Sequence, residues 1–105
     1  MSHEADFETL TREVSNFAKA RDWEKFHTPK NLAMAVAGEA GELAAEFQWL
    51  TAEESMLSSL SDEQLRKIRL EIADVQIYLL RIADVLDIDL PKAVFEKMKI
   101  NEARF

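Results

Sequence analysis

The sequence of 105 residues contains no cysteine, only two glycines and only two prolines. Without cysteine, the chain can form neither a disulfide nor a thiolate zinc site. An all-β fold needs many turns, and turns use glycine and proline heavily, so their scarcity argues against such a fold. An apolar run of 18 residues is also absent, as is a basic-then-apolar N-terminal signal pattern. These absences predict a soluble cytoplasmic protein without a membrane partner.

Basic residues are scarce relative to acidic ones, with 13 against 20 and a net charge of −7. This balance argues against a nucleic acid polymer as a partner. A small anionic substrate would then require a metal bridge rather than a basic pocket. Hydrophobic residues make up 48% of the chain, which is enough for one core. The length predicts a single domain over residues 1–105.

Apolar residues at steps of three and four predict helices over most of the chain. The first helix is expected over about residues 6–21. Thr28 and Pro29 are typical of an N-cap followed by proline at the first helical position, so the second helix is expected over about residues 29–50. The polar residues 51–60 are expected to connect it to the next helix.

Ser61 and Gln64 have the spacing of a capping box, so a third helix is expected to begin there and to reach about Leu86. Two apolar seams along it, one through Ile68, Ile72 and Leu79 and the other through Leu70, Ile77 and Leu80, predict packing on two sides. One of those neighbours is expected to come from another subunit. A fourth helix is expected to follow Pro91. Its residues expected to face inward are Val94, Met98 and Phe105. The sequence therefore predicts an all-α, oligomeric four-helix bundle.

Two acidic pairs interrupt the otherwise apolar second and third helices. Glu39 and Glu42 lie three residues apart, as do Glu71 and Asp74, so each pair shares one helix face. Like charges on one face repel, and burying an unpaired carboxylate is costly unless a cation compensates it. The sequence therefore predicts an acidic metal site between the second and third helices, with Tyr78 on the same stripe.

The four acids are oxygen ligands, which suit hard cations, chiefly Mg²⁺ with Mn²⁺ as a substitute. With metal bound, such a site would hold a triphosphate and support attack of water on phosphorus. A di-iron site is the rival metal interpretation, but it requires Glu-x-x-His motifs that neither His3 nor His27 completes. A solvated acidic face remains the alternative without metal, because isolated Glu-x-x-Glu motifs are common.

Gly38 and Gly41 lie beside the first acidic pair. Glycine inside a helix costs roughly 1 kcal/mol relative to alanine, so two of them indicate that something approaches the backbone closely. A tight helix crossing explains this at least as well as a ligand contact. Glu46 follows Glu42 by four residues and is interpreted as a solvent-facing acid or one behind the metal ligands.

Several stretches resemble a known family when they are taken in order. They are RDWEKFHTPKNL at 21–32, GEAGEL at 38–43, FQW at 47–49, Glu71-x-x-Asp74 with Tyr78, and DLPKAVFEKMKIN at 89–101. Together they resemble the all-α nucleoside triphosphate pyrophosphohydrolases, the MazG-like superfamily, and are most similar to its dCTP pyrophosphatase branch. The similarity covers about residues 10–101, and the four acids of the family motif are all present.

The resemblance implies Mg²⁺-dependent hydrolysis of a (deoxy)nucleoside triphosphate to the monophosphate and pyrophosphate, a house-cleaning reaction on the nucleotide pool. It implies a tetramer built from two dimers, with metal on Glu39, Glu42, Glu71 and Asp74. The residues implied to bind the nucleotide are Trp23, Trp49 and Tyr78 for base and sugar, and Lys97 and Asn101 from the last helix. Val14 stands where dCTP-specific relatives have a histidine near the base, so the preference for cytosine stays open.

Each of these residues also has a structural interpretation. Trp23 and Trp49 could be core or interface aromatics, and Lys97 and Asn101 could be a solvated face. His27 is interpreted as structural. Two other functions stay open: a non-catalytic helical module whose acids bind a basic peptide, and a relative that hydrolyses dUTP or phosphoribosyl-ATP.

Overall fold

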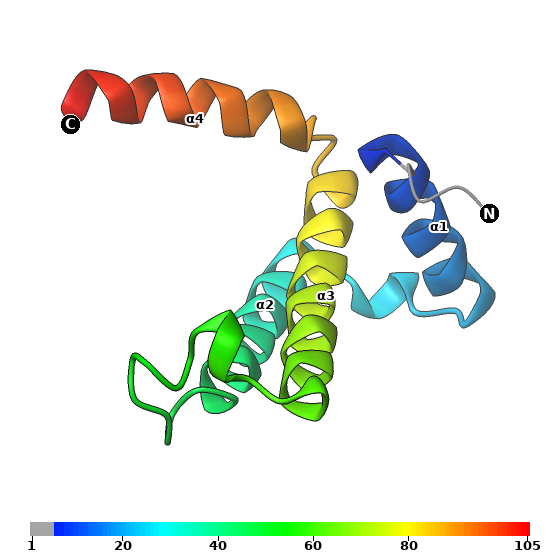
Figure 1. Ribbon diagram of the computed structural model, residues 1–105. Coiled ribbons are helices and arrows are strands. Elements are labelled where there is room, and N and C mark those ends of the chain that lie inside the picture. Colours follow the sequence, from blue (N-terminus) through cyan, green and yellow to red (C-terminus); the bar gives the residue numbers. More distant parts are fainter. Residues whose placement is uncertain (1–5) are drawn as a thin grey trace.

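The computed structural model describes residues 6–105 as helices joined by short connections (Figure 1). The α-helices are α1 (Phe7–Ala20), α2 (Pro29–Ala45), α3 (Asp62–Val85) and α4 (Leu90–Arg104). Two short 3-10 helices, η1 (Glu24–Phe26) and η2 (Leu57–Ser59), lie in the connections. Over this range the chain forms no strand, which confirms the predicted all-α class. None of these helices is both long and apolar enough to cross a membrane.

The predicted capping residues start α2 and α3. The Thr28 side chain accepts a hydrogen bond from the backbone N–H of Asn31, and Pro29 is the first residue of α2. At α3, the Ser61 hydroxyl accepts from the Gln64 N–H while the Gln64 side chain accepts from the Ser61 N–H. Because these caps satisfy N–H groups that have no partner inside the helix, they determine where the helices begin.

Helix α2 is shorter than predicted. It ends at Ala45 rather than near Leu50, and residues 46–50 form turns. The backbone N–H of Phe47 donates to the Ala44 carbonyl, and that of Leu50 donates to the Phe47 carbonyl. Bonds of this three-residue spacing keep the apolar residues on nearly the same face as an α-helix would, so the periodicity did not reveal the end.

Helix α3 is the centre of the fold. Helix α2 packs along it over the longest contact, and α1 contacts it over a shorter stretch (Figure 1). The buried apolar residues come from these three helices: Ala18, Leu32, Ile68, Leu80 and Ala83. The core is therefore a small three-helix arrangement with α3 between its two neighbours.

Helix α4 does not join this core. The chain leaves α3 through Asp87, whose φ is 56°, and α4 then projects away from the other helices (Figure 1). Val94, Met98 and Phe105 are 48%, 53% and 93% exposed, so the prediction that they face inward is wrong for the single chain. Apolar periodicity identifies the face of a helix that is buried, but it does not identify the surface against which that face packs. Within one chain only α1, α2 and α3 pack together, so α4 does not complete the predicted four-helix bundle.

Gly38 and Gly41 lie on an open face of α2. A Cβ atom built at either position would meet nothing within 4 Å in the part of the chain that the structure describes. Within residues 6–105 no helix crosses α2 closely at these positions, so a tight crossing inside one chain does not explain the two glycines. Close approach of a ligand or of a second chain remains as the explanation for the missing side chains at these two positions.

Candidate metal and nucleotide site

Carboxylates of α2 and α3 converge where these two helices pack together. Glu39, Glu71 and Asp74 each contribute one carboxylate oxygen, and these three oxygens lie within 4.8 Å of one another. Glu42 is not part of this group of three, but it is near enough for its charge to act on Glu71. The packing of α2 on α3 therefore brings the two acidic pairs of the sequence to one place.

Glu71 has the most unfavourable environment of these acids. Burial raises its pKa, and the charges of Asp74, Glu39, Glu42 and Glu46 raise the pKa further, in that order. Its Oε2 atom is buried and has no hydrogen-bond partner among residues 6–105. A buried carboxylate oxygen without a partner and surrounded by negative charge requires a cation or a proton.

The donor set of the acidic site fits a divalent cation. All three converging groups are carboxylates, and oxygen ligands suit hard ions. The ion pairs within the described range join Lys25 to Asp22, Lys67 to Glu63 and Arg81 to Asp84, so none of them compensates the site. The unpartnered Glu71 oxygen is the atom that such an ion would satisfy.

Glu46 lies near the acidic site without joining the converging group, as expected for an acid behind the metal ligands. It is the C-cap residue of α2, where the helix gives way to turns, and its charge still raises the Glu71 pKa. The spacing of four residues from Glu42 was the available signal. The sequence did not show that the end of α2 lies against the same part of α3.

A second feature, the α1–α3 cavity, has a volume of about 60 Å³. It is lined by Val14, Phe17, Ala18, Trp23, His27, Ile77, Tyr78 and Arg81. Trp23 and Tyr78, which the resemblance assigns to the base and sugar, therefore line the same cavity, together with Val14. Tyr78 lies one helical turn beyond Asp74, so the cavity adjoins the acidic site along α3.

Three other predicted nucleotide ligands belong neither to the cavity lining nor to the converging acids in the single chain. Trp49 follows the end of α2 and is 87% exposed. Lys97 and Asn101 lie on α4, which projects away from α2 and α3 (Figure 1). The cavity of one chain therefore offers a nucleotide Trp23 and Tyr78, and none of these three residues lines it.

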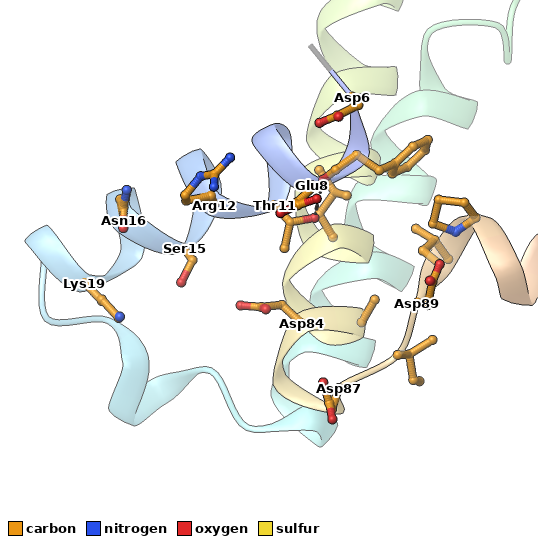
Figure 2. Close-up of a pocket in the computed structure, with 16 residues that line it drawn as sticks. Asp6, Glu8, Thr11, Arg12, Ser15, Asn16, Lys19, Asp84, Asp87 and Asp89 are labelled. Atoms are coloured by element: carbon orange, nitrogen blue, oxygen red, sulfur yellow. Dashed lines mark hydrogen bonds between the residues drawn. The ribbon is translucent and has the colours of Figure 1, made fainter.

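A larger groove of the structure is separate from the predicted site. Figure 2 shows this groove of about 870 Å³ between α1 and the connection from α3 to α4. Its charged lining residues are Asp6, Glu8, Arg12, Lys19, Asp84, Asp87 and Asp89. No residue assigned to metal or nucleotide lines it, so volume alone does not identify the site.

Arg81 and His27 form a contact that the sequence did not reveal. Arg81 Nε donates to His27 Nδ1 at 3.2 Å, and Arg81 Nη1 donates to Asp84 Oδ2 at 3.3 Å. Accepting at Nδ1 requires that this nitrogen of His27 carry no proton. Burial lowers the pKa of His27 and the Arg81 charge lowers it further, while Glu24 acts in the opposite direction. The place of Arg81 three residues after Tyr78, on the stripe of the acidic pair, was the only sequence signal for this contact.

We expect this contact to make stability depend on pH. The unfolded chain protonates His27 near its ordinary pKa of 6.5, and the folded chain does so only at lower pH. Between these two values the unfolded state holds more protons, so the stabilisation is full above about pH 6.5 and is lost as pH falls through the lowered folded pKa. His27→Gln keeps an acceptor but does not titrate, so its melting temperature should fall less between pH 7 and pH 5.

Thermal melts at constant ionic strength test this expectation. His3→Gln, at a position outside the described residues, measures how much the other histidine contributes to the change of melting temperature with pH. An equal fall in melting temperature between pH 7 and pH 5 for the unmodified protein and His27→Gln would contradict the expected role of the Arg81–His27 contact.

The geometry first defines a class: an all-α protein with a carboxylate site for a divalent cation and a small aromatic cavity beside it. No protein-family model matches the chain. It is 43% identical over 104 residues to human dCTP pyrophosphatase 1 and 41% identical to the bovine protein of that name. These alignments cover 99% of this chain, which spans about three fifths of the relatives' length (61% and 62%).

A solved structure gives similarity over whole chains. The crystal structure of a pyrophosphatase from Archaeoglobus fulgidus matches with a TM-score of 0.86 and 37% identity, covering 100% of this chain and 96% of that one. The chain belongs to the all-α nucleoside triphosphate pyrophosphohydrolases of the MazG-like superfamily. The family resemblance of its sequence motifs is thereby confirmed.

Proposed function

We propose that this chain is a Mg²⁺-dependent pyrophosphohydrolase, with Mn²⁺ as a possible substitute, that converts a (deoxy)nucleoside triphosphate to the monophosphate and pyrophosphate. Its preferred substrates would be dCTP or related deoxynucleotides, removed from the cytoplasmic pool. The convergence of Glu39, Glu71 and Asp74 around an unpartnered Glu71 oxygen carries the proposal. The names of the relatives, dCTP pyrophosphatase 1 and a pyrophosphatase, support the choice of bond.

The acids of α2 and α3 have two tasks in this reaction. Glu39, Glu42, Glu71 and Asp74 would hold the cation. When bound, it supplies positive charge to the phosphates and acidifies water for attack on phosphorus. Without it, the acids would repel a triphosphate, because like charges at a few ångströms interact strongly near a protein surface.

The neighbouring residues would orient the nucleotide. Trp23 and Tyr78 line the α1–α3 cavity, and Tyr78 lies one turn from Asp74 on α3. A base and sugar held at the mouth of this cavity would direct the phosphates along α3 toward the acids. Aromatic side chains suit this task because a base can stack on them whatever its identity.

A nucleotide screen tests the proposed function. The protein is incubated with dCTP, dUTP, dTTP, dGTP, dATP or phosphoribosyl-ATP, with and without Mg²⁺, and the products are separated by anion exchange. The expected products are monophosphate and pyrophosphate, formed only with metal. Dominant turnover of dUTP or phosphoribosyl-ATP would move the chain to another substrate. Binding of a basic peptide without turnover of any nucleotide would instead favour the non-catalytic helical module.

We also propose that the protein is a homo-oligomer, with a dimer as the unit and a dimer of dimers as the full assembly. Both seams of α3 and the apolar face of α4 leave large side chains exposed in one chain, among them Ile72, Ile77, Phe95 and Met98. Covering apolar surface contributes about 25 cal/mol per Å², so a second copy on these faces would be stabilising. A neighbouring copy would also be the source of Trp49, Lys97 and Asn101 for the nucleotide.

Sedimentation at micromolar concentration should therefore give the mass of two or four chains of 12.0 kDa. Phe95→Glu places a charge on a side chain that is 66% exposed in the single chain, so it should lower the mass without unfolding α1, α2 and α3. Arg104→Glu changes a charge on the opposite side of the same helix without removing an apolar group and is the control. A monomeric unmodified protein would refute the assembly.

A further inference from the structure

Arg81 is the one charged side chain that is buried within residues 6–105, with 4% of its surface exposed. It lies on α3 one turn beyond Tyr78 and lines the α1–α3 cavity with Trp23 and Tyr78. Burying a guanidinium is costly unless other groups compensate its charge and its five N–H donors. The partners of Arg81 therefore show whether the site is complete.

The partners of Arg81 compensate it only in part. His27 accepts from Nε at 3.2 Å as an unprotonated ring nitrogen and brings no negative charge. Asp84 accepts from Nη1 at 3.3 Å, but its side chain is 39% exposed, so solvent screens the ion pair. Neither bond involves Nη2, and two bonds leave three of the five donors without a partner among the described residues. Nη2 is not among the buried atoms without a partner, so it retains accessible surface although the side chain as a whole is buried. A largely buried cation with free, accessible donors therefore lines a cavity next to the acidic site.

We propose that Arg81 is a specificity-determining residue whose guanidinium donates to a carbonyl oxygen on the edge of the nucleobase. The inference rests on the proposed nucleotide function. The cavity of about 60 Å³ is well below the roughly 150 Å³ of an apolar cavity that holds benzene, so it does not admit a whole ring but is sufficient for an exocyclic oxygen. The ring itself would lie at the mouth beside Trp23 and Tyr78. Cytosine, thymine, uracil and guanine carry such an oxygen, and adenine does not.

Arg81→Met tests the proposal because it keeps an unbranched side chain of similar length and removes every donor. Binding of dCMP, dTMP, dGMP and dAMP is measured by calorimetry, together with kcat and KM for the four triphosphates. For the three bases with a carbonyl oxygen, affinity should fall and KM should rise about 10- to 100-fold, the range for a hydrogen bond to a charged group. The change for adenine should be about threefold or less, because it has no oxygen to lose.

Two further variants calibrate this result. Arg81→Lys retains the charge and some donors, so it should recover part of the preference for carbonyl-bearing bases. If Arg81→Met does not fold, Arg81→Lys is used to compare the bases that have a carbonyl oxygen with adenine. Arg69→Met replaces an exposed arginine of the same helix and should bind all four monophosphates as the unmodified protein does.

His27→Ala separates direct contact from an anchoring role. It removes the partner of Nε and loosens η1 but leaves the guanidinium in place. If His27→Ala reproduces the loss of base preference, or if Arg81→Met weakens dAMP as much as dCMP, the inference is overturned. If no triphosphate is hydrolysed while monophosphate preference still depends on Arg81, the base contact holds and the proposed reaction fails. If hydrolysis proceeds with base ranking unchanged in Arg81→Met, only the inference fails.

Discussion

Glu71→Gln is expected to abolish turnover and to reduce the thermal stabilisation by Mg²⁺. Its melting temperature without metal should equal or exceed that of the unmodified protein. Glutamine keeps the shape of the side chain but removes one of the charges that converge between α2 and α3. The cation would lose a ligand, while the metal-free site would lose a source of repulsion.

The raised pKa of Glu71 gives the sign of the effect without metal. The folded state retains the proton at pH values where the unfolded chain, with an ordinary pKa of 4.5, has released it. Folding stability therefore falls as pH rises above about 4.5 and through the raised folded pKa. The ionised form of Glu71 is therefore destabilising unless a cation binds, and glutamine removes this cost.

Thermal melts with and without millimolar Mg²⁺ measure both effects, with a non-hydrolysable nucleotide analogue present to complete the metal shell. Metal at a hundredfold its Kd stabilises a folded state by about 2.7 kcal/mol. Since 1 kcal/mol moves the melting temperature of a domain near this size by about 4–8 °C, the unmodified protein should show a rise of about 10–20 °C.

Glu63→Gln is the matched control for this experiment. It changes an exposed carboxyl of the same helix, whose pair with Lys67 lies at the surface and contributes little. It should keep turnover and the full response to Mg²⁺. If Glu71→Gln melts lower without metal and still responds fully to Mg²⁺, Glu71 is a structural hydrogen-bond acceptor and the proposed metal site is wrong.

Trp49→Ala is expected to weaken nucleotide binding about 5- to 100-fold while Mg²⁺ binding stays unchanged. Stacking of a base on an aromatic ring contributes about 1–3 kcal/mol, which corresponds to this range. Trp49 is 87% exposed in the single chain, so its removal opens no cavity in the core of that chain. A loss of affinity would therefore come from the nucleotide or from a neighbouring copy.

Trp23→Ala should behave differently from Trp49→Ala. Trp23 packs edge-on against Phe17, with ring centroids 5.6 Å apart, and lines the α1–α3 cavity. Its removal should lower both the melting temperature and the nucleotide affinity. Trp49→Ala should lower the affinity alone.

Nucleotide KM, Mg²⁺ titration and sedimentation are measured together for these variants. Phe105→Ala, which removes an aromatic ring that is 93% exposed, is the control for loss of exposed aromatic surface. An unchanged KM in a Trp49→Ala protein that dissociates or unfolds would show that Trp49 is an interface aromatic and not a nucleotide ligand.

Interactions between residues close in sequence could be predicted without the structure. The capping box of Ser61 and Gln64 and the Thr28-Pro29 start of α2 involve groups within one helical turn, so their residue types determine where the helices begin. The spacing of three within each acidic pair likewise placed both carboxylates on one helix face before any packing was known. The resemblance to the family motif indicated, in addition, that the faces carrying these two acidic pairs meet.

Only the tertiary structure decided which surfaces meet. It grouped Glu39 with Glu71 and Asp74 and left Glu42 outside this group, because the packing of α2 on α3 sets which turns face each other. It joined Arg81 to His27, 54 residues away in the sequence, and so placed a buried cation in the α1–α3 cavity. It also directed α4 away from the core. A periodic apolar face carries the same free-energy gain whether this chain or another covers it, so no local pattern could distinguish the two.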